Sequence, residues 1–164
     1  MDERARIDDF LAGKRLAFVG LSTDLRDFSH AVLDGFLAHD YEVIPVHPGV
    51  SEIRGMQTFA RVQDVPAKLY GAFVMTPPAA SASVVRDCIE AGVPRVWLHR
   101  GAGQGSVSDE AVRLCEEAGI SVVAGRCPLM FLDRPGFPHR LHRGLLKLVG
   151  RFPRRAETTT PAPP

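Results

Sequence analysis

The chain has 164 residues, 45% of them hydrophobic and 24% charged, which is the composition of an ordinary globular protein with one domain. Its formal net charge of +1 argues against a nucleic-acid-binding function for the molecule as a whole. The first residues are polar and indicate no signal peptide, and no apolar run approaches the roughly 20 residues that a membrane span needs.

From the amino terminus onward, the apolar pattern alternates between helices and strands. Apolar residues at helical spacing predict helices over residues 2–12, 29–39, 81–91, 108–118 and 141–149. Short, continuously apolar runs predict buried strands over residues 15–19, 42–46, 56–60, 71–75, 95–98 and 121–124. Gly92 and Gly119 follow the third and fourth helices, at positions where glycine commonly ends a helix.

This alternation favours an α/β fold, a single domain with a Rossmann-like parallel sheet and helices on both faces. Right-handed crossovers then predict the strand order 3-2-1-4-5-6. The expected divisions are an N-terminal lead-in helix (1–13), the Rossmann-like domain (14–132), a basic C-terminal helix (133–150) and a disordered tail (151–164). Residues 134–155 hold seven basic residues and no acidic one, so the rest of the chain sums to −6.

Cysteine and histidine spacing suggests no metal centre. Cys88, Cys115 and Cys127 are widely spaced and form no CxxC pair, which favours reduced thiols in a cytoplasm. Cys127 has no general base assigned by the sequence, so we interpret it as a small buried hydrophobe rather than a nucleophile. His139 and His142 have no evident third ligand and are interpreted as part of a basic surface or interface helix.

The first strand and the helix after it have the layout of a phosphate-binding turn. An apolar run stops at Gly20, and the helical pattern begins near Ser29. In α/β folds such a turn directs backbone N–H groups and a helix N-terminus at a phosphate. Ser22 and Arg26 lie in this turn, and a guanidinium pairs with phosphate as a planar fork. The alternative is that these two residues only cap a helix and solvate a surface.

Two markers of dinucleotide binding are missing. The turn has one glycine where the GxGxxG fingerprint needs three. The second strand ends at Val46-His47-Pro48, where an NAD-binding fold usually has an acid for the ribose hydroxyls. Both absences count against a dehydrogenase.

Ligands of such sheets bind beyond the carboxyl ends of the strands, which meet at one rim. The loops expected there are residues 20–22, 46–48, 76–78, 99–101 and 125–128. Arg100 and Gly101 are therefore candidate binding residues. Pro77 and Pro78 make a rigid wall for a ligand, or they only stop a strand.

Several segments have the order and spacing of one known family. They are Val19-Gly20-Leu21-Ser22 with Arg26 and Ser29, residues 41–48, residues 52–55, Thr76-Pro77-Pro78, and residues 91–92, 96–98 and 117–123. In this order they resemble the stand-alone CoA-binding domain family, relatives of the CoA-binding domain of the succinyl-CoA synthetase α subunit. The resemblance covers roughly residues 14 to 132.

The resemblance implies a Rossmann fold with coenzyme A as the ligand. It implies that Gly20, Leu21 and Ser22 face the CoA phosphates with backbone N–H groups and that Arg26 binds a phosphate. Ser29 belongs to the same motif. The synthetases also need a second domain with a phosphorylated histidine, so the resemblance implies no ligase activity for this chain alone.

By the same resemblance, His47 and Pro48 line the nucleotide cleft, and Thr76 and Pro77 flank the adenosine end. The chain departs from the family at two of these places. His47 stands where the family usually has asparagine, and Thr76-Pro77-Pro78 replaces an extended polar segment. A separate interpretation of His47 is a rim residue hydrogen-bonded to backbone, without a catalytic role.

Three functional hypotheses follow. The first is a protein that binds CoA or acyl-CoA, a small-molecule partner, without complete ligase machinery and without a catalytic residue that we can name. The second is an NADP- or nucleotide-dependent enzyme of Rossmann type, with Arg26 accommodating a 2′-phosphate. The third is an interaction module whose basic helix at 141–149 docks a partner or a second copy, which would make a homodimer.

Overall fold

The computed structural model of the protein describes residues 1–100 and 105–132. Gly101, His139, His142, the expected basic helix at 141–149 and the tail from 151 lie outside these residues. Within the described ranges, no helix is long and apolar enough to cross a membrane. The same ranges contain no group of three or more His, Cys, Asp or Glu side chains that could hold a metal ion.

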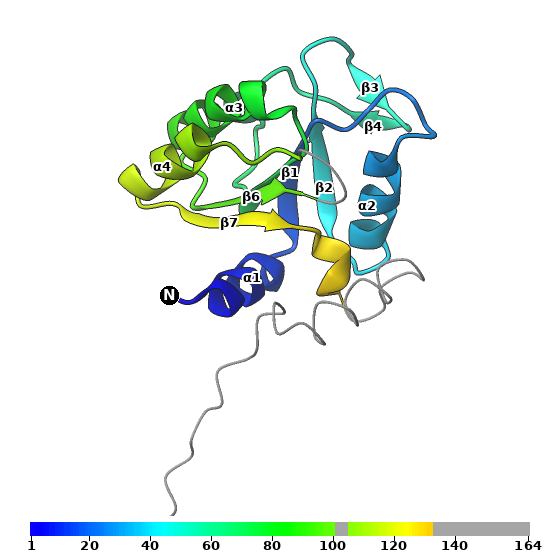
Figure 1. The fold of residues 1–164 in the computed structure, drawn as a ribbon. Helices are drawn as coiled ribbons and strands as arrows, with labels where there is room; N and C mark the ends of the chain where they lie inside the picture. The colour runs from blue at the N-terminus through cyan, green and yellow to red at the C-terminus, as the bar shows by residue number, and fades with distance from the viewer. Residues whose placement is uncertain (101–104, 133–164) are drawn as a thin grey trace, which may run out of the picture.

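Five parallel strands form the central sheet, in the order β2-β1-β5-β6-β7 (Figure 1). Their bounds are β1 Arg15–Val19, β2 Glu42–Val46, β5 Gly71–Val74, β6 Arg95–His99 and β7 Ser121–Arg126. All four residues of β5 are buried, as expected for a parallel strand covered on both faces. The predicted α/β class is confirmed, as is the relative order of these five strands.

The predicted third strand at residues 56–60 is wrong as a member of this sheet. β3 (Glu52–Ile53) and β4 (Met56–Gln57) instead pair antiparallel with each other, through a two-residue turn with positive φ at both positions. Only Phe59 reaches the sheet, by a single parallel bridge to Val46. Residues 52–57 form their backbone hydrogen bonds with each other. The edge of β2 therefore has a bridge to one residue, Phe59, in place of a neighbouring strand.

Four helices and two 3₁₀ turns complete the described fold. They are α1 Glu3–Ala12, α2 Phe28–Leu37, α3 Pro78–Glu90, α4 Asp109–Glu117, η1 Val62–Asp64 and η2 Pro128–Met130. α3 begins three residues before its predicted start at Ser81. The reason is Pro78, which occupies the first helical position, where a fixed φ is suitable and a missing N–H is no loss. The prolines therefore start a helix as well as ending a strand.

The helices cover the two faces of the sheet in pairs (Figure 1). α1 and α2 pack on one face, in a cluster with Phe18, Phe73 and Trp97. α3 and α4 pack on the other, in a cluster with Val74 and Leu98. The chain leaves β1 for α2 and leaves β5 for α3, so neighbouring strands send their connections to opposite faces. This topological switch point, at the carboxyl ends of β1 and β5, is where doubly wound sheets bind ligands.

Candidate functional site

Gly20 directly follows β1 at the switch point and has a φ of +96°, a conformation that favours glycine. A Cβ at this position would lie 2.7 Å from the carbonyl carbon of Met75 and 2.8 Å from the nitrogen of Thr76. The N–H of Met75 also donates to the carbonyl oxygen of Val19 at 2.7 Å. The loops after β1 and β5 are therefore in direct backbone contact, and both φ and space require a glycine at position 20.

Residues 22–29, the turn between β1 and α2, are held by hydrogen bonds between near neighbours. The N–H of Ser22 donates to Oγ of Ser29 at 3.1 Å, and the N–H of Asp24 donates to Oγ of Ser22 at 3.0 Å. The N–H of Ser29 donates at 2.8 Å to the carboxylate of Asp27, which is the N-cap of α2. Ser29 is thus a buried residue of the first helical turn, and Asp27 provides the cap.

Arg26 extends from this turn with 91% of its side chain exposed. Its Nε and Nη2 lie 3.2 and 3.3 Å from the two carboxylate oxygens of Asp24, and its backbone N–H donates to the same carboxylate at 3.0 Å. The Arg26 side chain lowers the pKa of Asp24, and the hydrogen bond from Ser29 lowers the pKa of Asp27. Both carboxylates are therefore ionised at neutral pH, inside a turn whose donors suit an anion.

Two buried histidines near this turn were not among the predicted site residues. The Nε2–H of His30 donates to the carbonyl oxygen of Ser22 at 2.9 Å. His99, at the end of β6, has its ring centroid 6.2 Å from that of Phe28 and 5.7 Å from that of Phe73. Period-two alternation along the strand places His99 on the face of Trp97, which was the available sequence signal. His30 follows Ser29 directly and offered no comparable signal.

His47 follows β2 and is half-buried. Its backbone N–H donates to the carbonyl oxygen of Phe59 at 2.8 Å, and its Nδ1 accepts the N–H of Gly49 at 3.0 Å. The imidazole therefore stabilises the turn that carries Pro48, and Pro48 itself is exposed. These contacts fit a rim residue that is hydrogen-bonded to backbone.

The loops after β5 and β6 complete the described rim. Oγ1 of Thr76 lies 3.2 Å from Oγ of the fully buried Ser81, which in turn lies 3.3 Å from the carbonyl oxygen of Pro77. Pro77 is exposed at the N-cap of α3. Arg100 is exposed after β6, and its N–H donates to the carbonyl oxygen of Arg126 at 3.4 Å. The Thr76 side chain is thus positioned by its contact with Ser81, while Pro77 and Arg100 are exposed to solvent.

The sheet order places the predicted residues in a row. Along the rim, His47 follows β2, Gly20 follows β1, Thr76 follows β5 and Arg100 follows β6. Neighbouring strands are about 4.8 Å apart, and β5 lies between β1 and β6, so the backbone of Arg100 lies roughly 10 Å from that of Gly20. We name this row, with the turn 22–29, the carboxyl-end rim.

The three cysteines are buried free thiols. Burial raises the pKa of Cys88, raises that of Cys115 to about 12 and raises that of Cys127 to about 11. A reactive cysteine needs the opposite change, because the thiolate is the nucleophile. Cys127 is therefore the buried hydrophobe that the sequence indicated.

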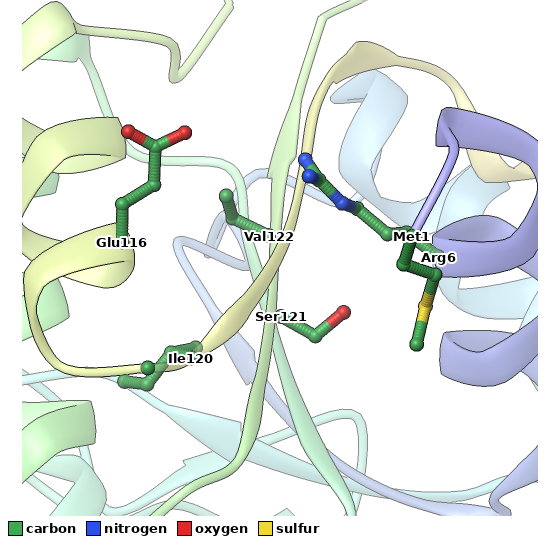
Figure 2. A pocket seen from close by; sticks show the side chains of 7 residues that line it. Met1, Arg6, Glu116, Ile120, Ser121 and Val122 are labelled. Carbon is green, nitrogen blue, oxygen red and sulfur yellow. The ribbon is translucent and has the colours of Figure 1, made fainter.

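A cavity of about 300 Å³ lies away from the carboxyl-end rim, beside the start of β7 and between α1 and α4 (Figure 2). It is lined by Met1, Arg6, Glu116, Gly119, Ile120, Ser121 and Val122. None of the predicted site residues lines this cavity. It flanks the edge strand near its amino end, whereas ligands of doubly wound sheets bind at the carboxyl ends.

Comparison with known proteins gives a consistent family assignment. The sequence profile of the family described as the CoA binding domain matches residues 14–133. Uncharacterized protein YneT of Bacillus subtilis is 29% identical over 125 residues, which are 76% of this chain and 90% of YneT. A hypothetical protein from Pyrococcus horikoshii has a similar solved structure, with a TM-score of 0.71 and 26% identity over 89% of this chain and 93% of that one.

A larger enzyme also contains this fold. The dinucleotide-forming acetyl-coenzyme A synthetase 1 of Ca. Korarchaeum cryptofilum matches with a TM-score of 0.57 and 28% identity. The match covers 66% of this chain but only 25% of the synthetase. The similarity to that enzyme therefore concerns one part of it.

Proposed function

This chain belongs to the CoA binding domain family, and we propose that it binds coenzyme A or an acyl-CoA at the carboxyl-end rim without complete ligase machinery of its own. The observation that carries the proposal is the turn after β1. Its backbone amide and guanidinium donors converge on the carboxylates of Asp24 and Asp27, at the switch point where a Rossmann-like sheet binds its ligand.

In this proposal the turn 22–29 binds a phosphate of CoA. The backbone N–H of Arg26 and the Oγ of Ser22 donate hydrogen bonds, and the guanidinium of Arg26 supplies the positive charge. The exposure of Arg26 leaves its guanidinium within reach of a ligand in solvent. The close approach of Gly20 to Thr76 keeps this turn beside the loop after β5.

In this proposal the rest of the rim contacts the remainder of CoA. His47 and Pro48 would line one side of the nucleotide, and Thr76 and Pro77 would flank its adenosine end. Arg100 supplies a second positive charge about 10 Å along the rim from Gly20, with Gly101 next to it. A ligand with a diphosphate and a separate 3′-phosphate has use for two such separated cations.

Isothermal titration of the full chain against CoA, acetyl-CoA, NAD, NADP and ATP tests this proposal. We expect a heat of binding with CoA and acetyl-CoA. The same two ligands should raise the unfolding temperature of the protein. At about 100 times its dissociation constant, the ligand should stabilise the fold by about 2.7 kcal/mol. Binding of NADP without binding of CoA would overturn the proposal and favour the nucleotide-dependent enzyme.

A further inference from the structure

The donors of the turn 22–29 are engaged by groups of the turn itself. The carboxylate of Asp24 accepts the backbone N–H and the guanidinium of Arg26, and the carboxylate of Asp27 accepts the N–H of Ser29. A phosphate that enters the turn meets these two negative charges first. The turn therefore contains its own competing anions.

The two carboxylates are not equivalent. Asp27 caps α2, so its hydrogen bond belongs to the helix. Asp24 lies in the loop, with 56% of its side chain exposed, and it binds Arg26 through an amide and a two-nitrogen fork. That donor set, a backbone N–H with a guanidinium, is the one that protein sites offer to a phosphate.

We propose that Asp24 competes with the ligand's phosphate for Arg26. The Asp24 carboxylate holds Arg26 in the free protein and thereby lowers the affinity of the site for phosphorylated ligands. This inference rests on the proposed CoA-binding function. When a phosphate binds, Arg26 exchanges the carboxylate for the phosphate, and Asp24 turns into solvent.

The exposure of both side chains makes this exchange feasible. Exposed ion pairs contribute little net free energy, so releasing one opposes binding only modestly. Neither Asp24 nor Arg26 is packed in the core, so both side chains can rotate without any movement of β1 or α2. Asp24 therefore affects affinity and leaves the fold unchanged.

Asp24→Asn is the direct test, because asparagine retains an oxygen for the N–H of Arg26 but loses the charge. We expect the variant to bind CoA about fivefold more tightly than the wild-type chain in titration calorimetry at low salt, and to unfold at the same temperature. Adenosine and pantetheine, which have no phosphate, should show no such gain. Unchanged or weaker CoA binding by a folded Asp24→Asn variant would overturn the inference.

A double-mutant cycle separates competition for Arg26 from simple charge repulsion. In an Arg26→Ala background, Asp24→Asn should improve CoA binding by less than about twofold, because no arginine is left to release. A full fivefold gain in that background would show that Asp24 acts on the phosphate alone, which contradicts the proposal.

Asp27→Asn is the matched control, since it removes the same charge three residues away and asparagine remains a good N-cap. It should gain less affinity than Asp24→Asn, and an equal gain would count against a specific role of Asp24. If neither the wild-type chain nor any variant binds CoA, the proposed function itself fails and the inference fails with it. Binding by the wild type without the Asp24 effect overturns only the inference.

Discussion

Two ion pairs at opposite ends of the parallel sheet differ in exposure and in the segments that they join. At the carboxyl-end rim, Arg26 pairs with Asp24, two residues away, and is 91% exposed. At the amino end, Arg95 of β6 pairs with Asp9 of α1, 86 residues away, at 2.8 and 3.1 Å, and is 23% exposed. Tyr70 joins this second group, which we name the Asp9 clasp, by donating its hydroxyl to the carbonyl oxygen of Asp9 at 3.0 Å.

The difference separates contacts that can be exchanged from contacts that hold the fold. Arg26 and Asp24 lie two residues apart in one loop and are both exposed, so a ligand can replace one partner without separating distant segments. The Asp9 clasp joins α1 to the sheet, and its guanidinium also stacks 4.0 Å from the ring of Tyr70. Breaking the clasp removes a contact between a helix and the sheet, whereas breaking the Arg26 pair removes only a contact within one loop.

The largest effect is expected where the rim meets the core. Gly20→Ala should lower the free energy of unfolding by about 3 kcal/mol or more, because it combines a positive φ with a Cβ under 3 Å from the backbone of Met75 and Thr76. Urea unfolding measures the loss, and CoA affinity should fall in the same variant.

Gly92→Ala is the matched control for that prediction. Gly92 has a φ of +65° but open space around a Cβ, so only the backbone conformation opposes the substitution. We expect a loss of about 1 kcal/mol and unchanged CoA binding. Equal losses at the two glycines would show that the contact between the β1 and β5 loops contributes nothing.

Arg26→Ala tests the exchangeable side of the comparison. Losing a charge-assisted bond to phosphate should weaken CoA binding by about 1.5–3 kcal/mol, or roughly ten- to a hundredfold. Because the side chain is exposed, the free energy of unfolding should stay within about 0.5 kcal/mol of the wild type. Unchanged affinity at low salt would remove Arg26 from the phosphate site.

Asp9→Ala tests the structural side and should give the opposite result. We expect the free energy of unfolding to fall by about 1–2 kcal/mol, since the variant loses a two-nitrogen ion pair from Arg95. CoA affinity should remain unchanged. Glu117→Ala, which breaks an exposed pair with Arg113, is the control and should change stability by less than about 0.5 kcal/mol.

The smallest expected effect concerns Cys127, which follows β7 at the carboxyl-end rim. Burial raises its pKa to about 11, so the thiol stays protonated at pH 8 and should react with a thiol reagent as slowly as Cys88 does. The buried neutral thiol contributes to the free energy of unfolding below about pH 9, and this contribution is lost as the pH rises toward 11. Rapid labelling of Cys127 that CoA suppresses would show that the rim is open as far as β7.

The turn after β1 could be predicted because its signals are local. A strand that stops at Gly20, followed by Ser22, Arg26 and a helix, indicates the turn without knowledge of any distant contact. The roles of individual rim residues remain predictions. Sequence reasoning missed Asp24 as the acidic partner of Arg26, because this pairing depends on how the loop folds. It placed His99 in a rim loop but did not name it as a site residue or anticipate its ring contacts with Phe28 and Phe73.

The sequence by itself determined the α/β class, the positions of the sheet's strands and the ends of most helices, because buried apolar runs, capping residues and glycines act within a few residues. The tertiary structure decided the rest. It decided that residues 52–57 pair with each other instead of extending the sheet, and that Asp9 meets Arg95. It also decided that Gly20 touches the loop after β5. These outcomes depend on which distant segments come into contact, and no local pattern of residues contains that information.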